Sequence, residues 1–445
     1  MNPSTGADLV WTAIHTLATR TAGLALGLVT SALIARALGP EGRGVYVYPT
    51  VLAATALSIS HLSLEQANVH LASTRRADLQ LLAGNAGLIA ILAGSAALLG
   101  MLGLFLAVPE AFPDVEPKWI ILVAASIPFA LHQLYIAGLA QLAHRLRALN
   151  TNQLVVGLVH LGAIVTLWVT DRLTPGGVLG VWVGIGFLHW WLTCRSLQPV
   201  ASLWPRLVPS LLRRSLAFGA SIHPGMVFLF LHLRADVIML RHLGGLADVG
   251  LYTLAVFMAE AIWLATGSVA AAGLPHQVET CGKEAARLTA RICRMNLALG
   301  VGLAGILAVA AVPALRLLYG EPFLPAAAAL WILLPGVLAF GVQGPCGAHL
   351  LRLDRPFTIT VISAGAVLLN IALNALWIPR WGIMGAALGS TVSYTLSAAT
   401  FLAWLLRTEG LTVREALVWT ADDTETVRRL LRGAVAAAAP GRARR

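Results

Sequence analysis

The feature that most constrains this chain is a series of long apolar stretches without charge. The stretch Leu81–Val108 carries no Asp, Glu, Lys or Arg over 28 positions, and the stretch Ile120–Ala143 carries none either. Runs of 18 or more such residues are typical of helices that cross a lipid bilayer. Charged residues make up 11% of the chain, whereas a soluble domain carries about 25%. The sequence therefore predicts an all-α polytopic membrane protein.

Charges, glycines and prolines divide the apolar pattern into about 12 transmembrane helices. We place these helices at roughly residues 10–35, 45–71, 81–107, 119–142, 151–169, 178–194, 216–240, 250–272, 296–314, 326–350, 357–377 and 382–406.

Lysine and arginine are concentrated on one side of the predicted membrane. The connections and tail on that side hold 22 of these residues, and the other side holds 7. Because positive charge marks the cytoplasmic side of a membrane protein, we expect both termini to be cytoplasmic. The net charge of +11 then follows from topology and from contact with membrane lipids, and we expect no nucleic-acid partner.

The chain contains an internal repeat. The segment Ala35–Gly39 (ARALG) recurs as Leu240–Gly244 (LRHLG), and Gly44–Tyr46 (GVY) recurs as Gly250–Tyr252 (GLY). The two copies are six predicted helices apart, so they have the same orientation in the membrane. A parallel repeat of six helices predicts two lobes around a central cavity, which is an arrangement common among transporters.

The repeat also sets the predicted domain boundaries. We assign residues 1–200 to an N-terminal six-helix lobe, residues 201–406 to a C-terminal six-helix lobe, and residues 407–445 to a basic cytoplasmic tail. Within the tail, we expect a helix over about residues 411–435, since Val427, Leu430, Leu431 and Ala434 fall on one helical face. We expect residues 436–445 to be disordered.

Three segments carry a family resemblance that spans the chain. They are Ala32–Tyr48, Arg234–Val256 and Leu369–Tyr394. Together they resemble the polysaccharide-transporter family, the O-antigen-type lipid-linked oligosaccharide flippases of the multidrug/oligosaccharidyl-lipid/polysaccharide exporter superfamily. The resemblance implies two lobes in a V shape, a cavity that opens alternately to each side, and a polyprenyl-diphosphate-linked oligosaccharide as cargo. It also implies a role in polysaccharide or lipopolysaccharide biosynthesis at the bacterial cytoplasmic membrane.

Two other functions stay open at this point. One is a multidrug or organic-cation antiporter of the same superfamily, which would need a buried carboxylate such as Glu260. The other is a membrane enzyme of polysaccharide assembly, a polymerase or ligase, which would need a long loop outside the membrane. The chain carries no recognisable catalytic motif, so we expect a protein that is not an enzyme and uses no cofactor.

Ionisable residues inside the predicted spans are the candidate substrate-binding residues, because such groups are costly in a bilayer. From the helical rise, Arg234 lies about 10 Å and Glu260 about 15 Å below the outer face. We expect this pair to form an ion pair or to share a water-filled cavity, with a possible link to an ion or proton gradient. Arg20 lies about 24 Å below the outer face, and we expect it to contact a diphosphate or to extend to the inner headgroups.

Four further polar residues complete the candidate site. His61 and Glu65 lie one turn apart on one helical face near the inner edge of the membrane; Glu65 has a second interpretation as a partner of a basic residue in the following loop. Asn370 and Asn374 share a face of a later helix, where interhelical hydrogen bonding is the alternative to substrate contact. The four cysteines form no CxxC pair, so we expect free thiols and no metal site.

Overall fold

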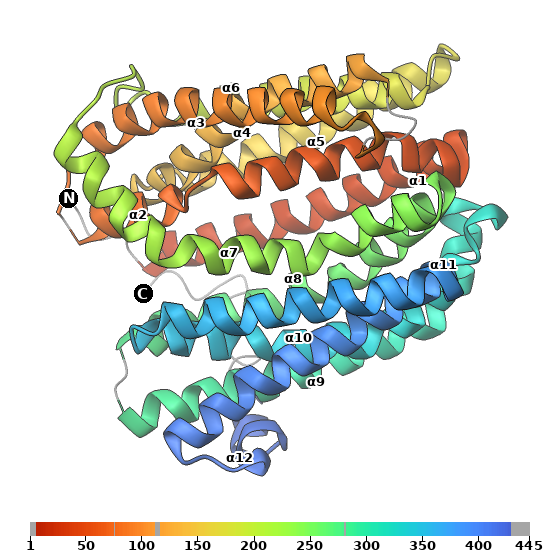
Figure 1. Cartoon of the computed structure of the whole chain (residues 1–445). Coiled ribbons are helices and arrows are strands. Elements are labelled where there is room, and N and C mark those ends of the chain that lie inside the picture. The colour runs from red at the N-terminus through yellow and green to blue at the C-terminus, as the bar shows by residue number, and fades with distance from the viewer. Residues whose placement is uncertain (1–5, 75, 112–115, 280–281, 429–445) are drawn as a thin grey trace.

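The computed structural model describes residues 6–74, 76–111, 116–279 and 282–428. Almost all of this part is helical (Figure 1). In chain order the helices are α1 (Gly6–Ser60), α2 (Leu64–Ser73), α3 (Leu79–Ala107), α4 (Pro117–Leu142), α5 (Leu146–Val169), α6 (Pro175–Leu197), α7 (Pro209–Leu243), α8 (Leu246–Glu279), α9 (Gly282–Ala314), α10 (Ala326–Arg352), α11 (Pro356–Glu409) and α12 (Val413–Leu417).

Ten helical segments in this described part are long and apolar enough to cross a membrane. Two of them, α1 and α11, each consist of two helices joined at a glycine. Gly39 (φ 67°) and Gly382 (φ 53°) take left-handed backbone conformations, which glycine adopts without steric cost. Pro40 follows the first break and suits the first turn of a new helix because it lacks an N–H group. The predicted architecture of about 12 membrane helices is thereby confirmed.

The helix boundaries differ from the predicted ones in two ways. The helices α7, α8 and α9 extend several residues beyond their predicted apolar cores, since a helix can continue past the bilayer into water. The prediction of one continuous helix over residues 45–71 is wrong near its end. The chain there forms two helices: the second half of α1, which ends at Ser60, and the separate helix α2, which begins at Leu64. Leu62 and Ser63 both have positive φ, 51° and 49°, and this left-handed pair ends the helix.

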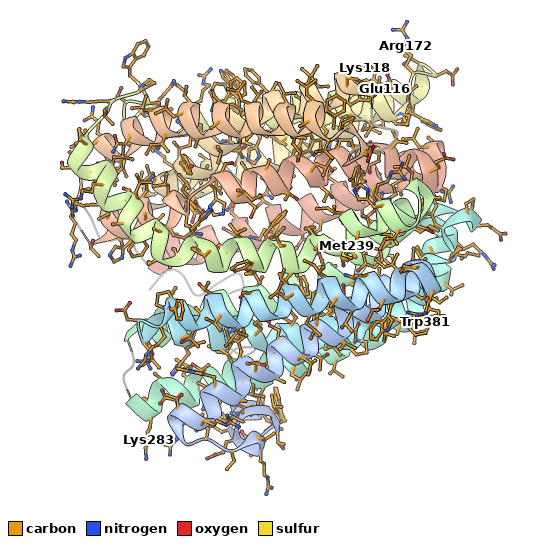
Figure 2. The ribbon with its side chains drawn as sticks, in the orientation of Figure 1. Glu116, Lys118, Arg172, Met239, Lys283 and Trp381 are labelled. Carbon is orange, nitrogen blue, oxygen red and sulfur yellow. The ribbon has the colours of Figure 1, made fainter. Side chains whose placement is uncertain are left out.

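The helices form two groups that meet along α1, α7 and α8 (Figure 1). Helix α1 packs against α5 in the first group, while α7 packs against α11 and α8 against α10 in the second. We call these groups the N-lobe (α1–α6) and the C-lobe (α7–α11). Figure 2 shows Lys118 and Arg172 at one end of the bundle and Lys283 at the opposite end. The break at Gly39 lies at the first of these ends, since a Cβ on Gly42 would lie 3.7 Å from Pro175 Cγ, close after Arg172. We call these the Gly39 end and the tail end.

The segment after α11 folds back onto α9 at the tail end. Arg294 on α9 donates two hydrogen bonds to the fully buried carboxylate of Asp423, with Nε–Oδ2 2.7 Å and Nη2–Oδ1 2.9 Å. The predicted continuous helix over residues 411–435 is wrong, because α12 ends at Leu417 and a second short helix covers residues 421–428. Thr420 caps that helix through mutual hydrogen bonds with Asp423. Residues 429–445, including Leu430, Leu431, Ala434 and the predicted disordered end, lie outside the described residues.

Candidate functional site

The predicted pair Arg234 and Glu260 forms a two-pronged ion pair between α7 and α8. The guanidinium Nη1 lies 2.7 Å from Glu260 Oε1, and Nη2 lies 3.1 Å from Oε2. The two side chains are 28% and 27% exposed. Both groups are therefore partly exposed. The two parallel hydrogen bonds between them fix the orientation of the guanidinium.

This ion pair lines a cavity of about 200 Å³ between the two lobes. The C-lobe contributes Arg234 and Glu260, and the N-lobe contributes Arg43 from the second half of α1. Two guanidinium groups against one carboxylate give the charged lining of this cavity a formal charge of +1. A small, positively charged cavity between two lobes is suited to an anion.

Neighbouring hydroxyl groups hold the Arg43 side chain, which is only 5% exposed. Its Nη1 donates to Ser31 Oγ at 3.1 Å and to Tyr46 Oη at 3.5 Å. Within the described part of the chain, its buried Nε has no hydrogen-bond partner. Arg43 therefore lines the cavity with its Nε–H group still able to donate a hydrogen bond.

A second polar network, made of one carboxylate and several uncharged groups, lies in the C-lobe around Asp236. This fully buried carboxylate accepts hydrogen bonds from Tyr252 Oη and from Ser390 Oγ, the latter at 2.8 Å. The predicted residues Asn370 and Asn374 belong to the same network: Asn374 Nδ2 donates to Asn370 Oδ1 at 2.9 Å, and Asn370 Nδ2 reaches Ser390 Oγ at 3.4 Å. These bonds join α7, α8 and both halves of α11, as interhelical hydrogen bonds in membranes commonly do.

The predicted residues His61 and Glu65 contact each other at the joint between α1 and α2. The distance from His61 Nδ1 to Glu65 Oε1 is 3.2 Å. The His61 ring also meets His223 of α7 edge to face, with ring centroids 4.9 Å apart. This cluster therefore joins the N-lobe to the C-lobe near the tail end.

The structure thus brings the predicted residues together as three separate pairs. Among the described residues, no hydrogen bond joins the Arg234–Glu260, His61–Glu65 and Asn370–Asn374 pairs to one another. Arg20 belongs to none of them: its side chain is exposed on the first half of α1, and it does not line the cavity that contains Arg234.

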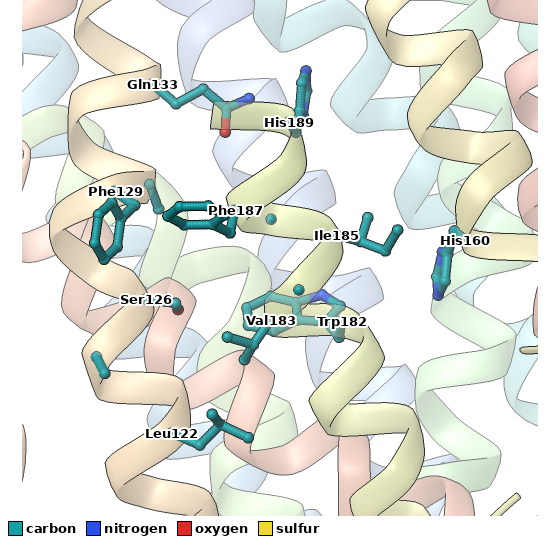
Figure 3. A pocket seen from close by; sticks show the side chains of 14 residues that line it. Leu122, Ser126, Phe129, Gln133, His160, Trp182, Val183, Ile185, Phe187 and His189 are labelled. Atoms are coloured by element: carbon teal, nitrogen blue, oxygen red, sulfur yellow. The ribbon is translucent and has the colours of Figure 1, made fainter. Parts of the chain in front are cut away.

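A cavity of about 640 Å³ lies within the N-lobe between α4, α5 and α6 (Figure 3). Phe129 and Phe187 meet edge to face on its wall, with ring centroids 5.4 Å apart. Ser126, Gln133, His160, Trp182 and His189 supply its polar groups. Its lining contains no Asp, Glu, Lys or Arg, so this cavity is suited to an apolar or aromatic molecule.

Sequence reasoning missed Arg43 and Asp236 as site residues. Arg43 follows a Gly-Pro pair and looks like a loop residue, but Pro40 begins a helix and places Arg43 one turn inside it. Asp236 is two residues from Arg234, so it falls on a different helical face and the spacing does not connect it with the ion pair. The usable signal for Arg43 is the repeat, since Arg43 directly precedes Gly44–Tyr46, the segment that matches Gly250–Tyr252.

No protein-family profile matches the sequence, and no curated protein matches it. Solved structures do match its fold. The lipid II flippase MurJ in an inward-closed conformation aligns with a TM-score of 0.70 at 12% identity, over 96% of this chain and 97% of that chain. An outward-facing multidrug resistance MATE family transporter of the MOP superfamily aligns with a TM-score of 0.66 at 11% identity, over 90% and 95%.

A Vibrio cholerae MATE transporter, VcmN, aligns with a TM-score of 0.62 at 15% identity, over 90% of this chain and 97% of that chain. Identities this low establish shared architecture and leave cargo to be argued from the site. The comparisons and the ten membrane-length apolar segments agree on one conclusion: this chain is a multi-pass membrane protein with the fold of the MOP-superfamily transporters.

Proposed function

We propose that the protein is a flippase that moves a polyprenyl-diphosphate-linked oligosaccharide from the inner to the outer leaflet of a bacterial cytoplasmic membrane. The lobes alternate between conformations open to either side, and both termini face the cytoplasm. The diphosphate occupies the cavity between the lobes while the polyprenyl tail stays in the surrounding lipid. The similarity in fold to a lipid II flippase is consistent with a cargo of this chemical class.

The observation that carries this proposal is the pairing of Arg43 and Arg234 across one cavity between the lobes. Guanidinium groups bind phosphate oxygens through paired hydrogen bonds as well as charge. Because one arginine belongs to each lobe, a bound diphosphate would draw the lobes together. Glu260 holds Arg234 in the empty state, so that the guanidinium is not left as an uncompensated buried charge. It gives up one of its two hydrogen bonds to Arg234 when the diphosphate arrives.

The second candidate is a multidrug or organic-cation antiporter. The aromatic cavity of about 640 Å³ in the N-lobe favours it, since drug-sized ligands occupy cavities of about 300–1,000 Å³. The carboxylates favour it less. Glu260 is engaged by Arg234 on both oxygens, and Asp236 is fully buried among hydrogen-bond donors, so neither presents an open negative charge to a cation.

A deletion strain of the native host separates the two candidates. The flippase proposal predicts that lipid-linked oligosaccharide accumulates in the inner leaflet, with unchanged susceptibility to cationic drugs. Complementation by the wild-type gene should clear the accumulated lipid, and complementation by the Arg43→Ala, Arg234→Ala double variant should fail at normal expression. Increased drug susceptibility without accumulation of the lipid would support the antiporter instead.

A further inference from the structure

A second cavity between the lobes, about 260 Å³ in volume, lies towards the tail end. Helices α7, α10 and α11 of the C-lobe form most of its wall, and Gln66 on α2 closes it from the N-lobe. The cavity is distinct from the one around Arg234, which α1, α7 and α8 line.

The polar groups of this second cavity are all uncharged. Gln66, Gln343 and Ser363 supply amide and hydroxyl groups, and the lining contains no Asp, Glu, Lys, Arg or His. Ser363 is 1% exposed, and within the described residues its Oγ has no hydrogen-bond partner; the same holds for the buried Gln66 Oε1. Buried polar atoms are costly unless they are paired. Both atoms belong to residues that line this cavity, and they point to a ligand that carries hydroxyl groups.

Glycine creates the hollow. Gly344 lines the cavity on α10, and a Cβ placed there would meet no atom within 4 Å. The absence of a side chain in mid-helix lowers helix stability by roughly 0.5–1 kcal/mol relative to alanine. This cost is explained if the space itself is needed.

A contact between two aromatic rings lies between this cavity and the helix that carries Glu260. Phe340, which lines the cavity, lies 4.7 Å from the Trp263 ring on α8, measured between centroids. Trp263 is one helical turn beyond Glu260, and its Nε1 donates to Val337 O at 2.9 Å, which fixes the ring. The Trp263–Phe340 contact therefore links α8, which carries Glu260, to the α10 wall of the second cavity, whose lining is mainly apolar with a few uncharged polar groups.

We propose that this second cavity is a sugar subsite, which binds an uncharged hexose ring of the cargo while the cavity around Arg234 binds its diphosphate. Amide and hydroxyl groups match the donors and acceptors of sugar hydroxyls, and the Phe340 ring offers an apolar face to the C–H side of a pyranose. This inference rests on the proposed flippase function and adds to it a neutral first sugar as the preferred cargo.

The test compares two lipids on the purified full-length protein in nanodiscs: polyprenyl diphosphate, and the same lipid carrying one neutral hexose. Native mass spectrometry gives the two dissociation constants. We expect the hexose-bearing lipid to bind about tenfold more tightly, a difference worth about 1.4 kcal/mol. Ser363→Ala should reduce this ratio to about threefold, and Gly344→Leu, which fills the hollow, should bring it to about one. Both variants should bind the bare lipid as the wild type does.

Ser215→Ala is the matched control. Ser215 is also 1% exposed with an unpartnered buried hydroxyl in the described part of the chain, but it does not line this cavity, so the tenfold ratio should persist. Equal binding of the two lipids by the wild type, or a ratio that survives Gly344→Leu, would overturn the sugar subsite and leave the diphosphate site standing. Failure of both lipids to bind would overturn the proposed function and the subsite together.

Discussion

Gly44 on α1 and Gly250 on α8 form a reciprocal contact between the lobes at the Gly39 end. A Cβ on Gly44 would lie 1.9 Å from the carbonyl oxygen of Leu246, and a Cβ on Gly250 would lie 1.9 Å from that of Pro40. Each glycine is four residues beyond the carbonyl that its counterpart touches. Repeat-related residues therefore meet in the way that equivalent residues meet across a two-fold axis, and only glycine permits this backbone approach.

This contact predicts the effect of adding one methyl group. Gly44→Ala or Gly250→Ala should destabilise the closed contact by about 1–3 kcal/mol, the usual cost of overpacking, and open the Gly39 end. A cysteine introduced at Val47 in the cavity, in a background without the four native cysteines, should then react faster with an impermeant maleimide. Gly245→Ala is the control, because its Cβ would meet nothing within 4 Å. Unchanged labelling in both glycine variants would contradict a closed contact here.

The Arg234–Glu260 pair predicts a recoverable charge swap. Arg234→Glu or Glu260→Arg alone places two like charges together in a largely buried site, which should cost about 3 kcal/mol. The double variant Arg234→Glu, Glu260→Arg restores an ion pair and should recover most of the lost thermal stability in detergent. A double variant no more stable than the worse single variant would show that the two groups do not depend on each other.

Arg20 gives a prediction that separates its two interpretations. If its charge contacts the cargo from the exposed face of α1, Arg20→Ala should lower export strongly, and Arg20→Lys should lower it less, since the charge survives while the paired hydrogen bonds are lost. Export is measured as oligosaccharide reaching the outer leaflet at matched expression. Normal export by Arg20→Ala would assign the residue to headgroup contact instead.

The buried Arg294–Asp423 contact predicts which acidic residue fixes the tail. Burial tends to raise the pKa of Asp423, but hydrogen bonds from Arg294 and Thr420 outweigh this and lower the pKa below its ordinary value. The carboxylate therefore contributes stability above its ordinary pKa and loses it only as the pH falls through the lowered value. Docking of α12 should accordingly be constant between about pH 5 and pH 8.

Hydrogen exchange of the α12 amides measures this docking. Asp423→Asn leaves Arg294 with an uncompensated buried charge and should weaken docking by about 3 kcal/mol. Asp422→Asn is the matched control, because Asp422 pairs with Arg291 at a side chain that is 63% exposed; exposed pairs contribute about 0–1 kcal/mol. Equal protection in the two variants would show that the buried contact does not hold the tail.

The sequence was sufficient for features that depend on one helix or on the repeat. Apolar length gave the membrane helices, and the rise per residue placed Arg234 and Glu260 at similar depth, which predicted their ion pair. Features that depend on distant partners could not be predicted in this way. Asp236 is 154 positions from Ser390, and His61 meets His223 from the other lobe; hydropathy and spacing contain no information about which helix faces which.

Local backbone geometry was the other limit. The division between α1 and α2 rests on two left-handed residues, Leu62 and Ser63, whose side chains suit a continuous helix as well. The Gly-Pro pair before Arg43 predicts a loop. In the structure the pair makes a single sharp turn and the helix resumes at once. The turn signal therefore gives no indication that Arg43 lines the same cavity as Arg234.

Reconstituted flipping shows whether this protein moves an anionic lipid-linked sugar. Proteoliposomes would contain a fluorescent polyprenyl diphosphate carrying one neutral hexose, with an impermeant quencher outside. Wild-type protein should lower the fraction of lipid that is protected from the quencher over time, and the Arg43→Ala, Arg234→Ala double variant should leave this fraction as in protein-free vesicles. Wild-type vesicles that exchange organic cations but never move the lipid would contradict the proposed flippase function.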